Sequence, residues 1–316
     1  MECLQLAVRI LEMREFEIPI HSKKDTTTIT FSESSDYAVN PMTLTNPPHN
    51  WEEEEVENPA GHTDWVYNSL TNELTVLRTV EIEDGEYAPW DDLQEGIESA
   101  VLVDGVAFVC DRAFIDCRRL KSVHIPKSVT SIGEWAFACC EGLESITIPD
   151  SVKTIGLDSF SECGFSSIKI PRSVVSFDGN PFVGCEYLTE IDVSENPNFV
   201  FVDGVLMNKD ITQIINCSPY NSGDYSIPNT VTAICTGAFC GCFRLTSIVI
   251  PDSVTSIGKH SFFDCNSLEF VVIPDSLISI GEEAFGSCSS LRSLVIPGSV
   301  ISIGKGAFGS CTSLES

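Results

Sequence analysis

Phenylalanine and cysteine recur at one spacing in this sequence, in the form Phe-x-x-Cys. The letters AFGSC occur at residues 284–288 and again at 307–311. A recurring cysteine can be a metal ligand, a disulfide partner or a nucleophile, and it is equally a small apolar residue suited to a core. The eight pairs are Phe114 and Cys117, Phe137 and Cys140, Phe160 and Cys163, Phe182 and Cys185, Phe239 and Cys242, Phe262 and Cys265, Phe285 and Cys288, and Phe308 and Cys311.

Metal binding is the first chemistry to test. Structural zinc requires four ligands that converge on one ion, with sulfur at about 2.3 Å. One cysteine per repeat spreads the sulfur atoms along a line, so we expect no metal site and no other cofactor. Disulfides are geometrically allowed between stacked coils, whose Cα atoms would lie about 5 Å apart. Each interior cysteine would have two equivalent neighbours, so we expect mainly reduced, packed thiols and leave some bridging open.

Catalysis is the second chemistry to test. A nucleophilic cysteine requires a lowered thiol pKa and a base nearby. Of the five histidines, only His124 and His260 lie within the repeats, and neither has a companion at triad-like spacing. The sequence contains no phosphate-binding loop and no dinucleotide fingerprint. We therefore predict no catalytic residues and no enzyme.

The pairs belong to a longer repeated pattern, written L-x-S-I-x-I-P-x-S-V-x-x-I-G-x-x-A-F-x-x-C. Residues 146–148 alternate as a half-buried strand does, and Pro149 ends that strand. A second short extended piece follows, up to Ile155. The glycine after it, Gly156, either takes a positive φ or lets neighbouring coils approach closely. The A-F-x-x-C segment is expected to form about one helical turn that buries both residues of the pair.

A unit of this size cannot bury its apolar face alone, so the units must stack. We predict a right-handed, curved, β-rich solenoid of about eight 23-residue repeats, with parallel strands and short helical turns. The interval between Phe182 and Phe239 is more than twice as long as the others and interrupts the period. An insertion inside the array is expected there.

These residues resemble the BspA-type leucine-rich repeat, found in surface and adhesion-like proteins of bacteria and protists. The resemblance covers about residues 62–316 and implies a leucine-rich-repeat solenoid. WVYNSLTNELTV at 65–76 resembles the capping hairpin that often precedes such repeats, and residues 201–228 resemble a β-hairpin insertion of the family. The resemblance implies a binding surface without catalysis, and a cell-surface or secreted location.

The expected organisation has five parts. Residues 1–61, rich in Thr, Ser, Pro, Asn and Glu, are predicted to be an acidic, largely disordered region. A capping-hairpin region at 62–96 precedes the first half of the array at 97–193. The hairpin insertion at 194–226 precedes the second half at 227–316. The chain stops at CTSLES, where the next I-x-I-P would follow, so we expect an uncapped C-terminal end, from a fragment or from an end that pairs with another chain.

The net charge of the chain limits the classes of partner that it can bind. The chain has 18 basic and 46 acidic residues, a formal net charge of −28 and a pI of about 4.3. Such a surface repels nucleic acid, because phosphate contacts require a basic patch. No long unbroken run of apolar residues is present, so we expect no membrane insertion. The first residues do not form a good secretory signal, because Glu2 stands in the place of a basic segment.

One strand position is free to vary for binding, namely the residue between the two strand isoleucines. Along the array it changes from polar residues to a stripe of valines, with Phe270 and Arg292 beside the stripe. Valine is favoured in any strand, so the stripe alone does not establish binding. The candidate binding face comprises His124, Thr147, Lys169, Asp192, Val249, Phe270, Val272, Arg292 and Val295.

We therefore predict a non-catalytic, adhesion-type binding protein that presents an extended strand face to a protein or glycan partner. The alternative is a structural module that assembles end to end through its uncapped C-terminal coil.

Overall fold

The computed structural model describes residues 56–57, 64–82 and 86–314. They belong to one compact unit, Glu52–Ser316. The predicted disorder of residues 1–61 falls outside the described residues, apart from strand β1 (Val56–Glu57), which pairs antiparallel with β2 (Trp65–Asn68).

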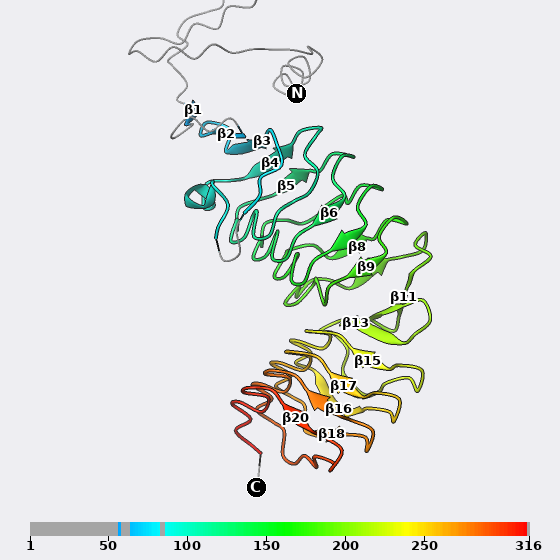
Figure 1. Ribbon diagram of the computed structural model, residues 1–316. Coiled ribbons are helices and arrows are strands. Elements are labelled where there is room, and N and C mark those ends of the chain that lie inside the picture. The colour runs from blue at the N-terminus through cyan, green and yellow to red at the C-terminus, as the bar shows by residue number, and fades with distance from the viewer. Residues whose placement is uncertain (1–55, 58–63, 83–85, 315–316) are drawn as a thin grey trace, which may run out of the picture. The chain divides into compact units, whose positions relative to one another are not determined.

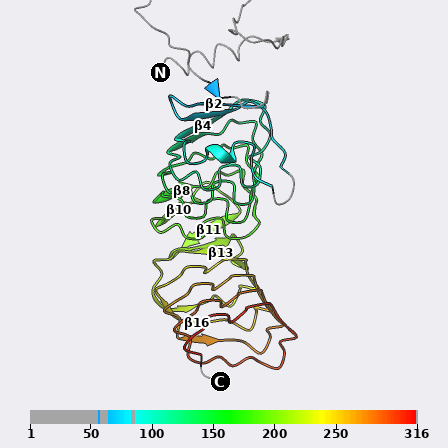
Figure 2. The ribbon, with the colours of Figure 1, turned by 90° about the vertical axis from the view of Figure 1, so that its left-hand side faces the viewer.

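The unit is a β-solenoid of about 10 turns, against the eight repeats counted from the Phe-x-x-Cys pairs. Most coils contribute a first strand, a second strand or both, all of them short, and the coils follow one another in chain order (Figures 1 and 2). Parallel strands of neighbouring coils pair because equivalent residues of each repeat lie in register, as for Ile257 and Ile280. The predicted solenoid is therefore confirmed.

The first strands of the coils form three parallel stretches. β3 (Glu73–Val76), β4 (Ser99–Leu102) and β5 (Ser122–His124) pair in order. β8 (Ser167–Lys169) pairs with β10 (Glu190–Asp192). β14 (Gly223–Ser226), β16 (Leu245–Val249) and β18 (Phe270–Val272) form the third stretch. Residues 146–148, predicted as a strand, carry none, so that prediction is wrong for this coil.

The second strands form two parallel stretches, each built from two-residue strands. The first stretch comprises β6 (Ser131–Ile132), β7 (Thr154–Ile155) and β9 (Ser176–Phe177). The second comprises β15 (Ala233–Ile234), β17 (Ser256–Ile257), β19 (Ser279–Ile280) and β20 (Ser302–Ile303).

The A-F-x-x-C segments form turns, so the predicted helical turns are wrong. Among the described residues the one helix is a 3₁₀ turn, η1 (Asp91–Leu93). Around Phe137, both Trp135 and Cys139 have a φ of 60°, a left-handed conformation that interrupts a right-handed helix. The amides of these three residues donate to carbonyls of the next coil, at 2.8 to 3.1 Å. Pairing between coils therefore replaces the hydrogen bonds that a helix would form within one coil.

The buried sides of these turns form a column of rings and thiols. The rings of Phe114 and Phe137 stack with centroids 5.2 Å apart and planes 1° apart. The same stacking joins Phe262 to Phe285 at 5.0 Å. Such contacts add to the burial of each ring. The eight cysteines lie beside the rings, seven of them fully buried and Cys311, in the last coil, partly buried.

The glycine position is explained by close approach, and not by a positive φ. A Cβ on Gly156 would lie 2.6 Å from the backbone nitrogen of Glu134, and one on Gly281 would lie 2.6 Å from Lys259 N, in each case in the preceding coil. Such distances are sterically excluded, so only glycine fits. Cys110 and Cys235 occupy this position in the coils that begin the two halves of the array, where no regular repeat precedes them.

The N-terminal hairpin closes the beginning of the column. Strands β2 and β3 pair antiparallel, and β3 continues in parallel into β4. Trp90 then covers the first ring of the column, with centroids 5.9 Å from Phe114. Its Nε1 donates a hydrogen bond to Ala113 O at 2.6 Å. The region therefore completes the core of the first repeat.

The insertion joins two hydrophobic cores. It contains β11 (Phe199–Val202), β12 (Val205–Asn208) and β13 (Gln213–Cys217), paired antiparallel, and β13 then pairs in parallel with β15. Leu206 and Ile215 are buried in the core of the first half. Their neighbours Met207 and Ile214 are buried in the core of the second half. The hairpin therefore lies between the two cores with both of its faces buried.

A group of buried amides closes the same junction on the side of the turns. Asn180 N donates to Thr236 O at 3.0 Å, and Asn180 Nδ2 donates to Gly237 O at 2.8 Å. Asn216 Nδ2 donates to Asn180 Oδ1 at 3.1 Å. Both asparagines are at most 4% exposed. We call Asn180 and Asn216 the junction amides.

Candidate binding surfaces

The strand face predicted for binding begins with polar residues. His124, Thr147 and Lys169 are exposed, and Asp192 is partly buried. Lys169 Nζ lies 3.0 Å from Glu195 Oε2, and this hydrogen bond raises the pKa of Lys169. Asp192 Oδ1 accepts a hydrogen bond from Ser194 N at 2.9 Å, and hydrogen bonding by Ser194 lowers the pKa of Asp192. These charges therefore already have partners in the chain.

In the second half the same face is apolar. Val249, Phe270, Val272 and Val295 have exposed fractions of 44%, 52%, 55% and 81%. Val249 pairs in register with Val272, so these side chains are direct neighbours across strands. The residues between them on the strands, such as Ile248 and Val271, are buried. We call the four exposed residues the apolar stripe.

Arg292 lies beside the stripe, where Arg292 Nη2 is 3.2 Å from Glu269 Oε2. Both side chains are substantially exposed, so the pair contributes little to stability. Its position at the side of an apolar surface resembles the polar rim of a protein interface.

The predicted face is divided by the insertion. Asp192 lies on β10, whose strand partner is β8, whereas Val249 lies on β16, between β14 and β18. Asp192 and Lys169 therefore belong to a different sheet from Val249, Phe270 and Val272. The structure brings together the members of the stripe, and it keeps them apart from His124, Thr147, Lys169 and Asp192.

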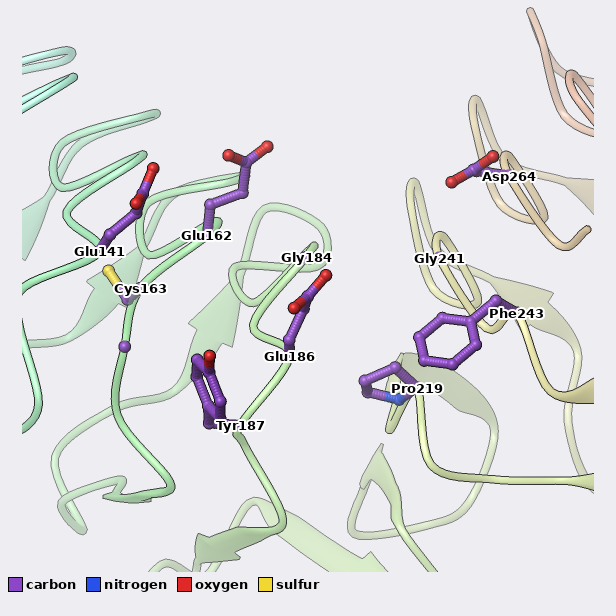
Figure 3. Close-up of a pocket in the computed structure, with 11 residues that line it drawn as sticks. Glu141, Glu162, Cys163, Gly184, Glu186, Tyr187, Pro219, Gly241, Phe243 and Asp264 are labelled. Atoms are coloured by element: carbon purple, nitrogen blue, oxygen red, sulfur yellow. The ribbon is translucent and has the colours of Figure 1, made fainter. Parts of the chain in front are cut away.

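A second surface was not predicted from the sequence, namely an open groove of about 600 Å³ beside the junction (Figure 3). One wall carries Glu186 and Tyr187, which follow Cys185. The opposite wall carries Pro219 and Phe243. The groove exists because the segment that leads into Pro219 enters between two coils that would otherwise stack directly. Its other lining residues include Glu141, Glu162 and Asp264.

One signal for this groove was present in the sequence. Two residues separate the cysteine from the leucine that follows it in most repeats, as Asn266 and Ser267 do after Cys265. Aromatic residues occupy these places only in the two coils that flank the insertion, as Tyr187 and Phe243. Their exposed fractions are 63% and 39%. The coincidence of exposed aromatics with an interruption of the period marks the groove.

The groove is acidic. Four carboxylates line it, and of these only Glu141 forms an ion pair among the described residues, with Arg118. Asp264 Oδ1 accepts a hydrogen bond from Asn266 Nδ2 at 2.8 Å. The guanidinium of Arg244 lies 5.5 Å from the ring centre of Phe243 and 5.1 Å from that of Tyr220. Aromatic rings in this region therefore already contact one cation.

The thiols are poorly suited to nucleophilic chemistry. Burial raises the pKa of Cys117 and Cys185 to about 12, and it raises that of Cys311 to about 11. A reactive cysteine requires the opposite shift. All cysteines in the described part of the chain are free thiols. The described residues also include no group of three or more His, Cys, Asp or Glu placed to hold a metal ion.

The described part of the chain contains no helix long and apolar enough to span a bilayer.

Comparison with known proteins supports the repeat assignment. The sequence model of the BspA type leucine rich repeat region matches residues 108–222 and 216–316, in six copies. The crystal structure of the pneumococcal vaccine antigen PcpA is similar with a TM-score of 0.61 and 20% identity, over 80% of this chain and 79% of that one. A leucine rich cell surface protein from Faecalibacterium prausnitzii is similar at 24% identity and a TM-score of 0.49, over 80% of this chain and 92% of that one. No curated protein sequence matches the chain.

Proposed function

Because this chain belongs to the BspA-type leucine-rich repeat family, a family of protein-binding repeats, we propose that it is a non-catalytic adhesion protein that binds a partner through its strand face. The observation that carries the proposal is the apolar stripe, in which Val249, Phe270 and Val272 are each 44% to 55% exposed. Contiguous exposed apolar surface of this kind marks interaction sites.

The position of the stripe supports the proposal further. Val249, Phe270 and Val272 project from β16 and β18, which pair with each other in parallel, and β16 also pairs with β14. A rigid backbone reduces the conformational entropy that is lost on binding. Phe270 supplies an aromatic anchor at the centre, as is common among the residues that dominate interface energies. We propose a protein partner, or alternatively a glycan, at a cell surface.

A binding screen on purified matrix proteins and glycans tests this proposal. The wild type would be compared with a Phe270→Ala, Val272→Thr variant by surface plasmon resonance. Val175 is equally exposed, at 57%, but lies beside β9 on the second-strand side of the coil, so Val175→Thr serves as the matched control. The proposal expects a binder that the stripe variant loses by tenfold or more and that the control retains. A binder unaffected by the stripe variant would show that binding occurs elsewhere.

Assembly through the last described coil is the second candidate. Ile301 and Ile303 are 82% and 50% exposed there, and exposed apolar residues on a coil favour stacking against a coil of another chain. Sedimentation velocity over a hundredfold range of concentration tests this candidate. It requires association that Ile301→Thr weakens, and a monomer at all concentrations would exclude it.

A further inference from the structure

We propose that the groove beside the junction is a docking site for an extended segment of another protein that carries lysine or arginine side chains. The groove is distinct from the apolar stripe, so this proposal goes beyond the adhesion function. It rests on the lining of the groove, on the fixed separation of its walls and on the charges that face it.

The separation of the walls is set by buried contacts. Asn180 bonds across the junction to Thr236 and Gly237, so the coil of Tyr187 is tied to the coil of Phe243. On the same side Cys217 N donates to Ala238 O at 2.7 Å. These bonds are buried, and breaking them leaves polar groups unpaired. The groove is therefore preformed and does not close on itself.

The charges select the occupant. Glu162, Glu186 and Asp264 form no ion pair within the described part of the chain, and no lysine or arginine lines the groove. Three carboxylates along one groove repel each other and attract a cation, and a low-dielectric wall strengthens that attraction. An anionic segment is excluded on the same grounds. The occupant is therefore basic.

The aromatic side chains specify how a cation would be held. Tyr187 and Phe243 come from opposite walls, as Figure 3 shows. A guanidinium or ammonium beside such a ring is stabilised by the ring electrons. The chain already uses one face of Phe243 in this way, for Arg244. The exposed ring of Tyr187 offers an unused site beside Glu186.

The shape selects an extended segment. The groove is open to solvent, and its carboxylates lie on both walls, with Glu141, Glu162 and Glu186 on one side of the junction and Asp264 on the other (Figure 3). Its volume of about 600 Å³ lies in the range of sites that bind small molecules. A small ligand would leave most of its surface exposed here, whereas an extended chain can place successive side chains beside successive carboxylates.

Fluorescence anisotropy with a labelled Gly-Arg-Gly-Lys-Gly-Arg-Gly peptide tests the proposal, at a salt concentration of about 0.15 M so that distant charges are screened. Variant Glu162→Gln, Glu186→Gln removes two groove charges. Variant Asp252→Asn, Asp275→Asn removes two exposed charges elsewhere, so both variants have the same net charge. Tyr187→Ala is matched by Tyr87→Ala, since Tyr87 is 60% exposed and lies outside the groove. Thermal melting checks that each variant is folded.

The proposal expects the groove charge variant to weaken binding at least tenfold, and Tyr187→Ala to weaken it about twofold to fivefold. The two control variants should bind as the wild type does. Equal losses in the two charge variants would show attraction by net charge alone and would overturn the proposal. An unchanged affinity of Tyr187→Ala, or no binding by the wild type, would overturn it as well.

Discussion

The thiol of Cys140 donates a hydrogen bond to the carbonyl oxygen of Phe114, in the preceding coil, across 3.2 Å. The same bond, from a cysteine to the phenylalanine of the preceding coil, recurs at 3.0 to 3.2 Å in the five other coils that follow a regular repeat. The cysteine therefore recurs because its thiol bonds to the preceding coil, and the phenylalanine recurs because its ring stacks on that of the neighbouring coil. The sulfur has to remain a protonated thiol, because a disulfide has no donor.

The first prediction concerns this bond. Cys140→Ala removes a fully buried sulfur and its hydrogen bond, and should lower the free energy of unfolding by about 1–2 kcal/mol. The adjacent Cys139 is partly exposed, so Cys139→Ala should change it by less than about 0.5 kcal/mol. Urea unfolding of both variants measures the difference. Equal effects would mean that the buried thiol has no special role.

The second prediction concerns the glycines that face a neighbouring coil. Gly281→Ala would place a Cβ 2.6 Å from Lys259 N, so the coils must separate. A loss of more than about 2 kcal/mol is expected, as in other cases of overpacking. Gly298 has nothing within 4 Å of the same position, so Gly298→Ala is the control and should be neutral. The melting temperatures of the two variants measure this difference, and equal melting temperatures would contradict the prediction.

The third prediction concerns pH. Burial, with a smaller contribution from nearby Glu134, raises the pKa of Asp158 to about 7, and its Oδ1 has no hydrogen-bond partner. The Asp158 carboxyl therefore binds its proton more tightly in the folded state than in the unfolded chain, where the pKa of this group is near 3.8. The stability that protonated Asp158 contributes is present at low pH, and it is lost as pH rises towards and through 7.

Asp158→Asn should remove that loss. The melting temperature of the variant should exceed that of the wild type at pH 8 by several degrees, and the difference should shrink at pH 5. Asp252→Asn removes an exposed carboxylate and controls for net charge. A constant difference between variant and wild type across this pH range would contradict the buried-charge explanation.

The fourth prediction concerns the junction amides. Asn180→Ala leaves the side-chain amide of Asn216 and the backbone N–H of Phe182 without their acceptor, at a cost of about 2–3 kcal/mol. The two cores should then unfold less cooperatively. All four tryptophans precede residue 136, so their fluorescence reports the first half, whereas circular dichroism reports both. The two urea curves should separate in this variant.

The matched variant for the junction is Asn266→Ala, which removes an exposed amide from a regular repeat. Its two unfolding curves should coincide with those of the wild type. Coincident curves for Asn180→Ala would show that the hairpin alone couples the two halves.

The solenoid and its buried column were predictable because every coil repeats one pattern. Period, register and the identity of the inward residues all follow from spacing, since stacked coils present the same face to each other. The local conformation of the turns was less accessible. The sequence A-F-x-x-C suits a helical turn, but pairing with the next coil stabilises left-handed residues such as Trp135 and Cys139. The stabilising hydrogen bonds come from another coil, and the helix propensity of a local segment does not include them.

The two surfaces show the same distinction. The apolar stripe was predicted residue by residue, because strand alternation places Val249 and Val272 outward from Ile248 and Val271. That Asp192 and Lys169 lie in a different sheet from Val249, Phe270 and Val272 was not predicted. The groove was missed, although Tyr187 and Phe243 interrupt the pattern at the coils beside the insertion. Its walls come from segments that meet only when the chain is folded.

The amino-acid sequence by itself determined the repeat, the parallel stacking and the residues of the core, because these depend on periodicity that every coil obeys. The tertiary structure alone decided where the stacking is interrupted, how the junction amides hold the two halves, and which carboxylates face the groove. Those features depend on contacts between residues far apart in the chain, such as Asn180 and Gly237, which no period relates.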